Sequence, residues 1–399
     1  MPSHAAVRAH FPALASGFAY LENAGGSQVP ASVADAIRDY MLNTYVQTGA
    51  GYLQSVAATE VVSRAHAWME TFVNTEGTGR VVLGPSSTAL VEMIANAYGN
   101  VWQPGDEVII ATNNHEANAG PWAKLASRGV VVREWPVNPE TFECEIDDLE
   151  SLLGPRTKMV AFPHVSNLLG QVADVAAITK IVHAVGARVC VDGVAYAPHR
   201  AIDVAAWGVD WYVFSNYKVF GPHMATLFGR NDAFAEIKGP NHFFIPDDAV
   251  PYKYELGGIS HEACAGLLGL QPYFRFLAER DRDDRETIDS AFQAVEALEQ
   301  APHDALLAGL QDLPVRLVGQ NPAVKRVPTV SFLHDRLSSP EVVAHVDSAN
   351  IGIRYGHMYA VRLCKALGID LSTGVVRVSL AHTSTVDEID RLLAVLRTL

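Results

Sequence analysis

Short apolar runs alternate with amphipathic stretches over the first two thirds of the chain. The apolar runs are typical of strands buried on both faces, and they cover residues 79–84, 106–112, 130–137, 157–165, 187–194, 211–216 and 225–230. Between them, periodic apolar positions predict helices at 87–98, 121–129, 146–154 and 174–186. This alternation predicts an α/β fold with a mostly parallel, seven-stranded sheet, which would bind ligands beyond the carboxyl ends of its strands.

The pattern changes after about residue 259, where long helical stretches replace the alternation. Helices are predicted at 264–281, 288–310 and 385–399, and shorter strands at 327–334 and 375–381. The last helix has acidic residues in its first turn and arginine near its end, as the helix dipole favours. We therefore predict a large domain of residues 16–265 and a smaller α+β domain made of residues 1–15 and 266–399.

Composition narrows the class of protein. The chain has 399 residues, of which 49% are apolar and 19% are charged, as is typical of a globular enzyme. The net charge of −14 and the lack of a basic run argue against a nucleic-acid surface. No apolar stretch is long enough for a signal peptide or a membrane span. The four cysteines are widely spaced and predict reduced thiols, so we expect a cytoplasmic protein that binds neither nucleic acid nor membrane.

One polar feature follows the first predicted strand. The strand stops at Gly84, and a helix begins with the hydroxyl-bearing run Ser86–Thr88. Free backbone amides, the helix dipole and up to three hydroxyl groups would then converge on one point, as in an anion site. An ordinary Ser/Thr helix N-cap is the alternative interpretation.

An aspartate and a lysine lie at two further strand ends. Asp192 would either cap a helix or hold a cationic nitrogen at the edge of the sheet. Lys218, one of eight lysines, lies in the aromatic stretch "DWYVFSNYKVFGP". It either extends its amine to solvent or is a desolvated, nucleophilic amine. An anion site, a buried acid and a buried amine together match what pyridoxal phosphate requires of a protein.

Seven motifs occur in order over nearly the whole chain: "YLENAGG", "NNHEANAGPW", "PHVSNLLG", "VDGVAYAPH", "FSNYKVFGP", "IRYGH" and "VVRVSLAHTSTVDEIDRLL". This series resembles the class V aminotransferase family of fold-type I pyridoxal-phosphate enzymes, on its cysteine desulfurase-like branch. The resemblance implies a large cofactor-binding domain, a smaller C-terminal α+β domain and a homodimer with its site near the subunit interface.

The resemblance also assigns roles to matching positions. Lys218 would form the imine with pyridoxal phosphate, Asp192 would pair with the ring nitrogen, and His115 would stack on the ring; these three would be the catalytic residues. Asn167 would hydrogen-bond the phenolic oxygen of the cofactor. The phosphate would be held by Ser87, Thr88 and Ser215. The substrate carboxylate would be bound by Arg377, with Arg354, His357 and Tyr359 nearby.

The sequence departs from the desulfurase pattern at the persulfide-forming cysteine. That position is Tyr359, and Cys364 follows five residues later, about 7.5 Å along a predicted helix. Because Cys364 shares an apolar helix face with leucines, we predict that it packs in the interior. Ala195 and Tyr217 stand where the family has glutamine and histidine, which removes one hydrogen bond at the phenolic oxygen and alters a phosphate contact.

The residues for imine chemistry are present, whereas the family's persulfide-forming cysteine is absent. We therefore predict a lyase or transferase that cleaves a β-substituent, for example at a C–S bond, of a small L-amino acid. Several alternatives remain. They are a cysteine desulfurase that uses Cys364 or an external thiol, a transaminase, a β-decarboxylating aldol-type enzyme acting on aspartate and, in a different class, a non-catalytic scaffold. The motifs "HEANA" and "HEACA" lack the second histidine of a zinc helix, so no metal is expected. Pyridoxal phosphate is the expected cofactor.

Overall fold

A seven-stranded sheet forms the centre of the larger part of the molecule. The structure is a computed structural model that describes residues 1–319 and 325–399. The strands are β2 (Gly79–Gly84), β3 (Glu107–Ala111), β4 (Val131–Trp135), β5 (Thr157–Pro163), β6 (Arg188–Asp192), β7 (Trp211–Ser215) and β8 (Ala225–Arg230). Their order is β2-β8-β7-β6-β5-β3-β4, with β8 antiparallel to both neighbours and the other pairs parallel. The mostly parallel, seven-stranded sheet predicted from the apolar runs is confirmed.

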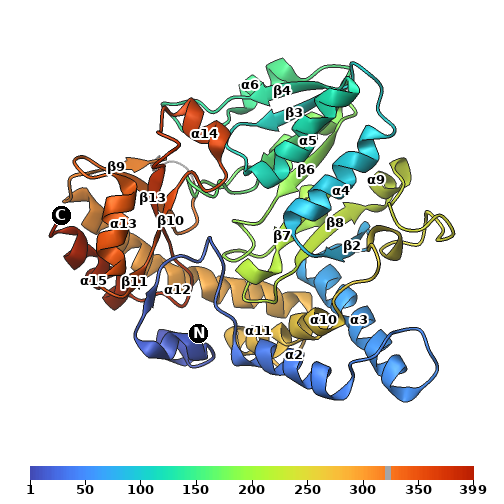
Figure 1. The fold of residues 1–399 in the computed structure, drawn as a ribbon, viewed down its shortest axis with the longest axis horizontal. Helices are drawn as coiled ribbons and strands as arrows, with labels where there is room; N and C mark the ends of the chain where they lie inside the picture. Colours follow the sequence, from blue (N-terminus) through green and yellow to red (C-terminus); the bar gives the residue numbers. More distant parts are fainter. Residues whose placement is uncertain (320–324) are drawn as a thin grey trace.

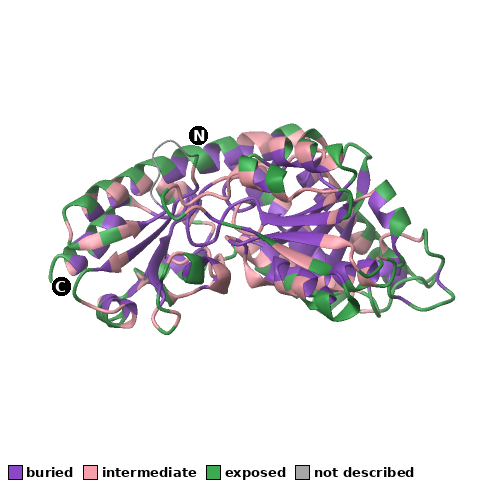
Figure 2. Ribbon diagram, turned by 90° about the horizontal axis from the view of Figure 1, so that it is seen from above, coloured by how far each residue is buried: buried purple, intermediate pink, exposed green. Residues whose placement is uncertain are grey.

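Helices cover both faces of this sheet because side chains alternate along its strands (Figures 1 and 2). In β6, Val189 and Val191 pack into the core on one face, and Cys190 packs into the core on the other. The first face is covered by α3 (Leu53–Phe72), α6 (Ile146–Leu152), α7 (Val175–Ala184), α8 (Val204–Trp207), α10 (His261–Leu268), α11 (Leu270–Ala278) and the first half of α12 (Arg285–Gln311). The second face is covered by α4 (Ser87–Gly99), α5 (Gly120–Ala123) and α9 (Asn231–Glu236).

Two predicted helices are interrupted in the structure. The segment 121–129 is split into α5 and a tighter 3₁₀ turn at Lys124–Arg128. The segment 264–281 is split into α10 and α11 at Gly269. A Cβ at Gly269 would lie 2.6 Å from the backbone oxygen of Ser32, so this turn is held by close contact with the start of α2 (Ala31–Asn43). Apolar periodicity carries no information on this contact.

A four-stranded antiparallel sheet forms the smaller part, in the order β12-β13-β10-β9. Its strands are β9 (Val315–Val318), β10 (Thr329–His334), β12 (Arg354–Gly356) and β13 (Val375–Ser379), and its helices are α13 (Ser339–Asp347), α14 (Val361–Ala366) and α15 (Val386–Leu396). The second half of α12 contributes Leu306 and Leu310 to its core, so this helix joins the two parts (Figure 1). Within the described ranges, no helix is both long and apolar enough to cross a bilayer.

The N-terminal segment lies beside the smaller sheet. It contains α1 (His4–Arg8) and β1 (Ala19–Tyr20), and β1 pairs in parallel with β11 (Ile351–Gly352). The backbone N–H of Asn23 then donates a hydrogen bond to the carbonyl of Ser379 at the end of β13 (3.0 Å). The predicted boundary at residue 16 assigns β1 to the large domain, whereas its strand partner lies with the smaller one. This pairing brings the residues after β1 to the edge of the large sheet's cavity.

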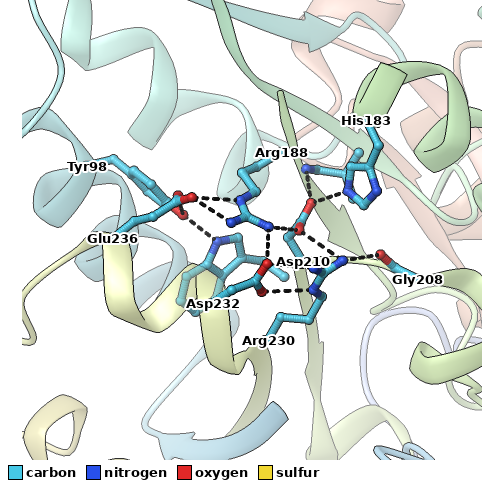
Figure 3. Close-up of polar contacts among 10 residues, drawn as sticks. Tyr98, His183, Arg188, Gly208, Asp210, Arg230, Asp232 and Glu236 are labelled. Atoms are coloured by element: carbon cyan, nitrogen blue, oxygen red, sulfur yellow. Dashed lines mark hydrogen bonds and ion pairs between the residues drawn. The ribbon is translucent and has the colours of Figure 1, made fainter. Parts of the chain in front are cut away.

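A network of charges holds the amino ends of β6 and β7 (Figure 3). Asp210, just before β7, is completely buried, and its Oδ1 accepts a hydrogen bond from Arg188 Nη1 (2.7 Å). Its Oδ2 accepts a hydrogen bond from the Val189 N–H (2.8 Å) and lies 2.8 Å from His183 Nε2. Arg188 also donates to Asp232 (3.0 Å) and Glu236 (2.5 Å) on α9. This network lies at the opposite end of β6 from Asp192, so it supports the strands without entering the cavity at their carboxyl ends.

Candidate active site

The carboxyl ends of β6 and β7 and the N-terminus of α4 meet at one cavity. Its inner part has a volume of about 90 Å³ and its outer part of about 550 Å³. Both parts are lined by Thr88, His115, Asn167, Tyr217 and Lys218. Cys190 and Val213 pack on the α4 face of the sheet, and by the period of two Asp192 and Ser215 point toward the same face.

Hydroxyl groups line the end of the inner cavity next to α4. Ser86 is the N-cap of this helix, because its side chain accepts a hydrogen bond from the Ala89 N–H (3.1 Å). Ser87 and Thr88 follow it, and the amides of a first helical turn have no carbonyl partner within the helix. Ser87 Oγ lies 3.1 Å from Ser215 Oγ at the end of β7. The N-cap interpretation is therefore correct for Ser86, whereas its two neighbours contribute free amides and hydroxyl groups to the cavity.

Asp192 is the last residue of β6 and lines the inner cavity. It is 5% exposed, and its Oδ1 accepts a hydrogen bond from the Val194 N–H (2.9 Å). Burial raises the pKa of its carboxyl group to about 6, against the opposing effects of that hydrogen bond and of the Lys218 charge. Burial therefore destabilises the ionised carboxylate, and a cationic group bound in the cavity would stabilise it.

Lys218 lies in a 3₁₀ turn, Asn216–Lys218, directly after β7. Its amine is desolvated rather than extended into bulk solvent. Burial lowers its pKa to about 8, the charge of Arg377 adds to this effect, and Asp192 opposes it. Its Nζ lies 5.9 Å from the centre of the Tyr217 ring. Near neutral pH, a fraction of this amine is therefore uncharged and nucleophilic.

Lys253 is also withdrawn from solvent, being 4% exposed, which the sequence did not indicate. Its Nζ donates hydrogen bonds to the carbonyl groups of Ile245 (2.8 Å) and His242 (3.2 Å), and it lies 3.3 Å from Asp247. These partners satisfy the ammonium group, so Lys253 holds its own loop together. Lys218 differs because its amine faces a cavity.

His115 and Asn167 line both parts of the cavity. His115 Nδ1 accepts a hydrogen bond from the Ala117 N–H (3.0 Å). Burial, with the charges of Lys218 and Arg377, lowers the pKa of His115 to about 4, so its ring is neutral. Asn167 Nδ2 donates to the carbonyl of Met358 (2.8 Å), and its buried Oδ1 has no hydrogen-bond partner in the described part of the chain. That oxygen can accept a hydrogen bond from a ligand.

Two arginines and a glutamate line or adjoin the wall toward the smaller sheet. Arg377 is buried, donates from Nη1 to the carbonyl of Asn167 (3.2 Å), and has a buried Nε with no hydrogen-bond partner among the described residues. Arg354 is exposed and lies directly opposite Arg377 in the β12–β13 pair. The Glu22 carboxylate contacts both guanidinium groups. Glu22 is absent from the candidate residues of the sequence, because it is far from both arginines along the chain.

His357 and Tyr359 lie at the outer rim. Tyr359 is 67% exposed, lines the outer cavity, and its ring centre is 5.4 Å from that of His115. Its backbone is held from both sides: its N–H donates to His357 Nδ1 (3.1 Å), and its carbonyl accepts from the Glu116 N–H (2.9 Å). His357 is not among the residues that line either part of the cavity; it positions Tyr359.

Cys364 lies on α14 and is completely buried. It packs in an apolar cluster with Leu363 and Met358, and burial raises the pKa of its thiol to about 11. A buried thiol of high pKa is a poor nucleophile. Ala195 and Tyr217 both line the inner cavity, and the Tyr217 ring stacks on His223, with ring centres 4.3 Å apart.

The fold and the site define a class of protein. A mostly parallel seven-stranded sheet with a smaller antiparallel sheet, and a cavity at the carboxyl ends of the large sheet's strands, is the architecture of fold-type I pyridoxal-phosphate enzymes. The chain belongs to the Aminotransferase class-V family, whose sequence profile matches residues 19–392.

Individual relatives place the chain on the cysteine desulfurase-like branch of that family. It is 38% identical to the aminotransferase-like protein FGM3 of Gibberella zeae over 98% of this chain and 96% of the relative. It is 32% identical to a cysteine desulfurase of Dickeya dadantii over 97% of this chain and 94% of the relative.

Solved structures share the fold. An apo cysteine desulfurase from Thermococcus onnurineus NA1 superposes with a TM-score of 0.88 at 24% identity, over 100% of this chain and 99% of the other. A mutant of C-DES with glycine covalently linked to its PLP cofactor superposes with a TM-score of 0.77 at 21% identity, over 99% of both chains. The fold-type I expectation is therefore confirmed.

Proposed function

We propose that the protein is a pyridoxal-phosphate-dependent lyase or transferase that cleaves a bond at the β-carbon of a small L-amino acid. The observation that carries this proposal is the desolvated amine of Lys218. It shares the inner cavity with the carboxylate of Asp192 and with the hydroxyl groups of Ser87 and Ser215. An amine, an acid and an anion site within one cavity are the three groups that this cofactor needs.

The residues of the inner cavity fit the cofactor group by group. Ser87, Thr88 and Ser215, with the first-turn amides of α4, would hold its phosphate. Asp192, whose pKa is raised by burial, would gain a cationic partner in the protonated ring nitrogen. The Oδ1 of Asn167, which has no partner among the described residues, would accept a hydrogen bond from the cofactor's hydroxyl group. When bound, pyridoxal phosphate supplies an aldehyde that condenses with amines and a ring that withdraws electrons from the substrate Cα.

The chain's own residues would bind the substrate and move its proton. Arg377 would bind the carboxylate through Nε, the buried donor that has no partner within the described chain. Lys218 Nζ would take the proton from the substrate Cα, because the lowered pKa leaves part of the amine free to accept one. His115, which is neutral, would cover the cavity without adding a positive charge next to that amine.

The rim favours a lyase over a desulfurase that forms its own persulfide. The backbone of Tyr359 is fixed by hydrogen bonds through its N–H and its carbonyl, and Cys364 is buried in an apolar cluster. A desulfurase that transfers sulfur to an external thiol is the second candidate, favoured by the similarity to cysteine desulfurases. Cys364→Ser tests for an internal persulfide, because sulfide release from cysteine should be unchanged if Cys364 carries no sulfur. Loss of sulfide release in a folded variant would restore Cys364 as the sulfur carrier.

We also propose that the protein works as a homodimer in the cytoplasm. Large apolar side chains are exposed on α2, on α3 and on the segment between them, and a patch of this kind supports self-association. They are Met41, Leu42, Tyr45, Tyr52, Leu53 and Val56. All four cysteines are free, as in a reducing compartment. Light scattering of the purified protein should give twice the chain mass, and a monomer at all concentrations would contradict the dimer.

Cofactor attachment tests the central proposal. The purified protein should be yellow, and borohydride should bleach it and fix the cofactor on the peptide that contains Lys218. Lys218→Ala should abolish turnover and covalent attachment. Lys124→Ala is the matched control, since Lys124 also lines the outer cavity but is paired with Glu92 (2.8 Å), and it should keep both properties. A colourless protein that takes up no added pyridoxal phosphate would support a non-catalytic scaffold instead.

A substrate screen tests the reaction. Amino acids are supplied singly, and the release of pyruvate, alanine, sulfide or ammonia is measured. β-Elimination predicts pyruvate with ammonia, and desulfuration predicts alanine with sulfide. Conversion of an added keto acid into its amino acid, without either product pair, would indicate a transaminase.

A further inference from the structure

Two positive charges face each other at the carboxylate-binding wall. Arg354 and Arg377 form a directly opposed pair in the antiparallel β12–β13 register. Like charges in such a pair destabilise a sheet. Arg377 is 2% exposed, so solvent screens its charge poorly. This arrangement requires a negative charge close to both groups.

Glu22 supplies that charge from the N-terminal segment. Its Oε1 lies 2.6 Å from Arg354 Nε, and its Oε2 accepts a hydrogen bond from Arg354 Nη2 (3.3 Å). The nearest contact with Arg377 is longer, 3.6 Å from Oε1 to Nη2. Arg354 is therefore engaged by both oxygens of Glu22, whereas Arg377 keeps donors for another carboxylate.

Gly25 leaves the space that the Glu22 carboxylate fills. A Cβ at Gly25 would lie 1.9 Å from Glu22 Oε1 and 2.6 Å from Glu22 Cδ. The conflict would involve the end of a flexible side chain and not the backbone. An alanine at this position would therefore push the carboxylate away from the arginines without changing the charge of the chain.

We propose that Glu22 is a specificity-determining residue that restricts the site to amino acids with a single carboxylate. This inference rests on the proposed function, because it assigns the substrate carboxylate to Arg377. With Arg354 neutralised by Glu22, the positive charge of Arg377 remains, and one carboxylate balances it. A second carboxylate on the substrate would find no available cation in this wall, because Arg354 is already paired with Glu22. The site then selects neutral side chains over aspartate-like ones.

Spectral titration of the holoenzyme with L-alanine and L-aspartate measures this selectivity. The wild-type protein should bind alanine more tightly than aspartate. Glu22→Gln should raise the ratio of aspartate to alanine affinity by about tenfold or more, which corresponds to about 1.4 kcal/mol. Gly25→Ala should move the ratio in the same direction with the charge retained. Glu92→Gln, which changes a carboxylate of the outer cavity that is paired with Lys124, should leave it unchanged.

A second measurement separates the failure of this inference from the failure of the proposed function. Propionate and succinate need no cofactor to bind, so their effects on the melting temperature of the cofactor-free protein report on the arginine wall directly. Propionate should stabilise the wild-type protein more than succinate does, and Glu22→Gln should reverse that order. Two results would overturn the role of Glu22. One is unchanged selectivity in both Glu22→Gln and Gly25→Ala, and the other is a wild-type preference for the dicarboxylates. Absence of cofactor uptake together with the expected selectivity would overturn the proposed function alone.

Discussion

Replacing Asp192 by asparagine in the cofactor-free protein is expected to stabilise the fold. The carboxyl group is 5% exposed, and burial raises its pKa from 3.8 to about 6. At about 1.4 kcal/mol for each pH unit between the two values, burying the ionised form costs about 3 kcal/mol above pH 6. Asparagine carries no charge and can still accept the Val194 N–H (2.9 Å). The pKa of about 6 already includes the opposing attraction to Lys218, so the gain expected from asparagine is about 3 kcal/mol.

The sign of the pH dependence follows from the raised pKa of Asp192. Between pH 3.8 and about 6, the folded wild-type protein binds more protons at this group than the unfolded chain does. The contribution of Asp192 to the free energy of unfolding therefore falls as pH rises through this window and stays low above it. The stability difference between variant and wild type should be small near pH 4 and reach its full size by about pH 7.

Urea unfolding of the cofactor-free proteins at about pH 4.5 and pH 7.5 measures this difference. Asp174→Asn is the matched control, since Asp174 is an exposed N-cap whose role asparagine can fill, and it should change stability by less than about 0.5 kcal/mol at either pH. If Asp192→Asn is no more stable than the wild type at pH 7.5, or if its advantage does not depend on pH, the burial cost assigned to Asp192 is wrong. The same variant should hold the cofactor more weakly, because the ring nitrogen loses its anionic partner.

Three further predictions concern other parts of the structure. Arg188→Ala should lower the free energy of unfolding by about 3 kcal/mol, because the buried Asp210 loses its closest cation and keeps His183, the Val189 N–H and the more distant Arg230 (3.7 Å). A loss below about 1 kcal/mol in urea unfolding would contradict this. Gly193→Ala should cost about 2–3 kcal/mol by the same assay, since its Cβ would lie 2.2 Å from the buried Tyr212 ring, and wild-type stability would refute that contact. The rate of pyridoxal phosphate uptake should rise with pH and level off above about 8, where Lys218 has lost its proton; a rate independent of pH, followed by stopped-flow absorbance, would exclude this amine as the attacking group.

Much of the larger sheet and of the cavity could be predicted from the sequence because both depend on local patterns. An apolar run with a period of two predicts a buried strand, and the residue after it lies at the sheet edge. This reasoning found Asp192 and Lys218 separately, whereas Ser215 was assigned from the family resemblance. The parallel order of β6 and β7 brings their strand ends together. Apolar periodicity likewise predicted that Cys364 packs inside, as it does.

Features that depend on contacts between distant segments were not predictable in this way. The break between α10 and α11 at Gly269 reflects the approach of Ser32, and the burial of Lys253 reflects carbonyl groups of its own folded loop. Neither contact leaves a periodic signal in the sequence, because each depends on where a second segment lies in space.

The sequence by itself determined the strands, most helices and the chemical groups available at the strand ends, because periodicity and residue type act over a few neighbouring positions. Tertiary structure alone decided which charge neutralises which. Glu22 and Arg354 are 332 residues apart in the chain, and they meet because β1 pairs with β11 and carries the N-terminal segment to the β12–β13 edge. Electrostatic attraction depends on distance in space, so this contact exists once the chain has folded and not before.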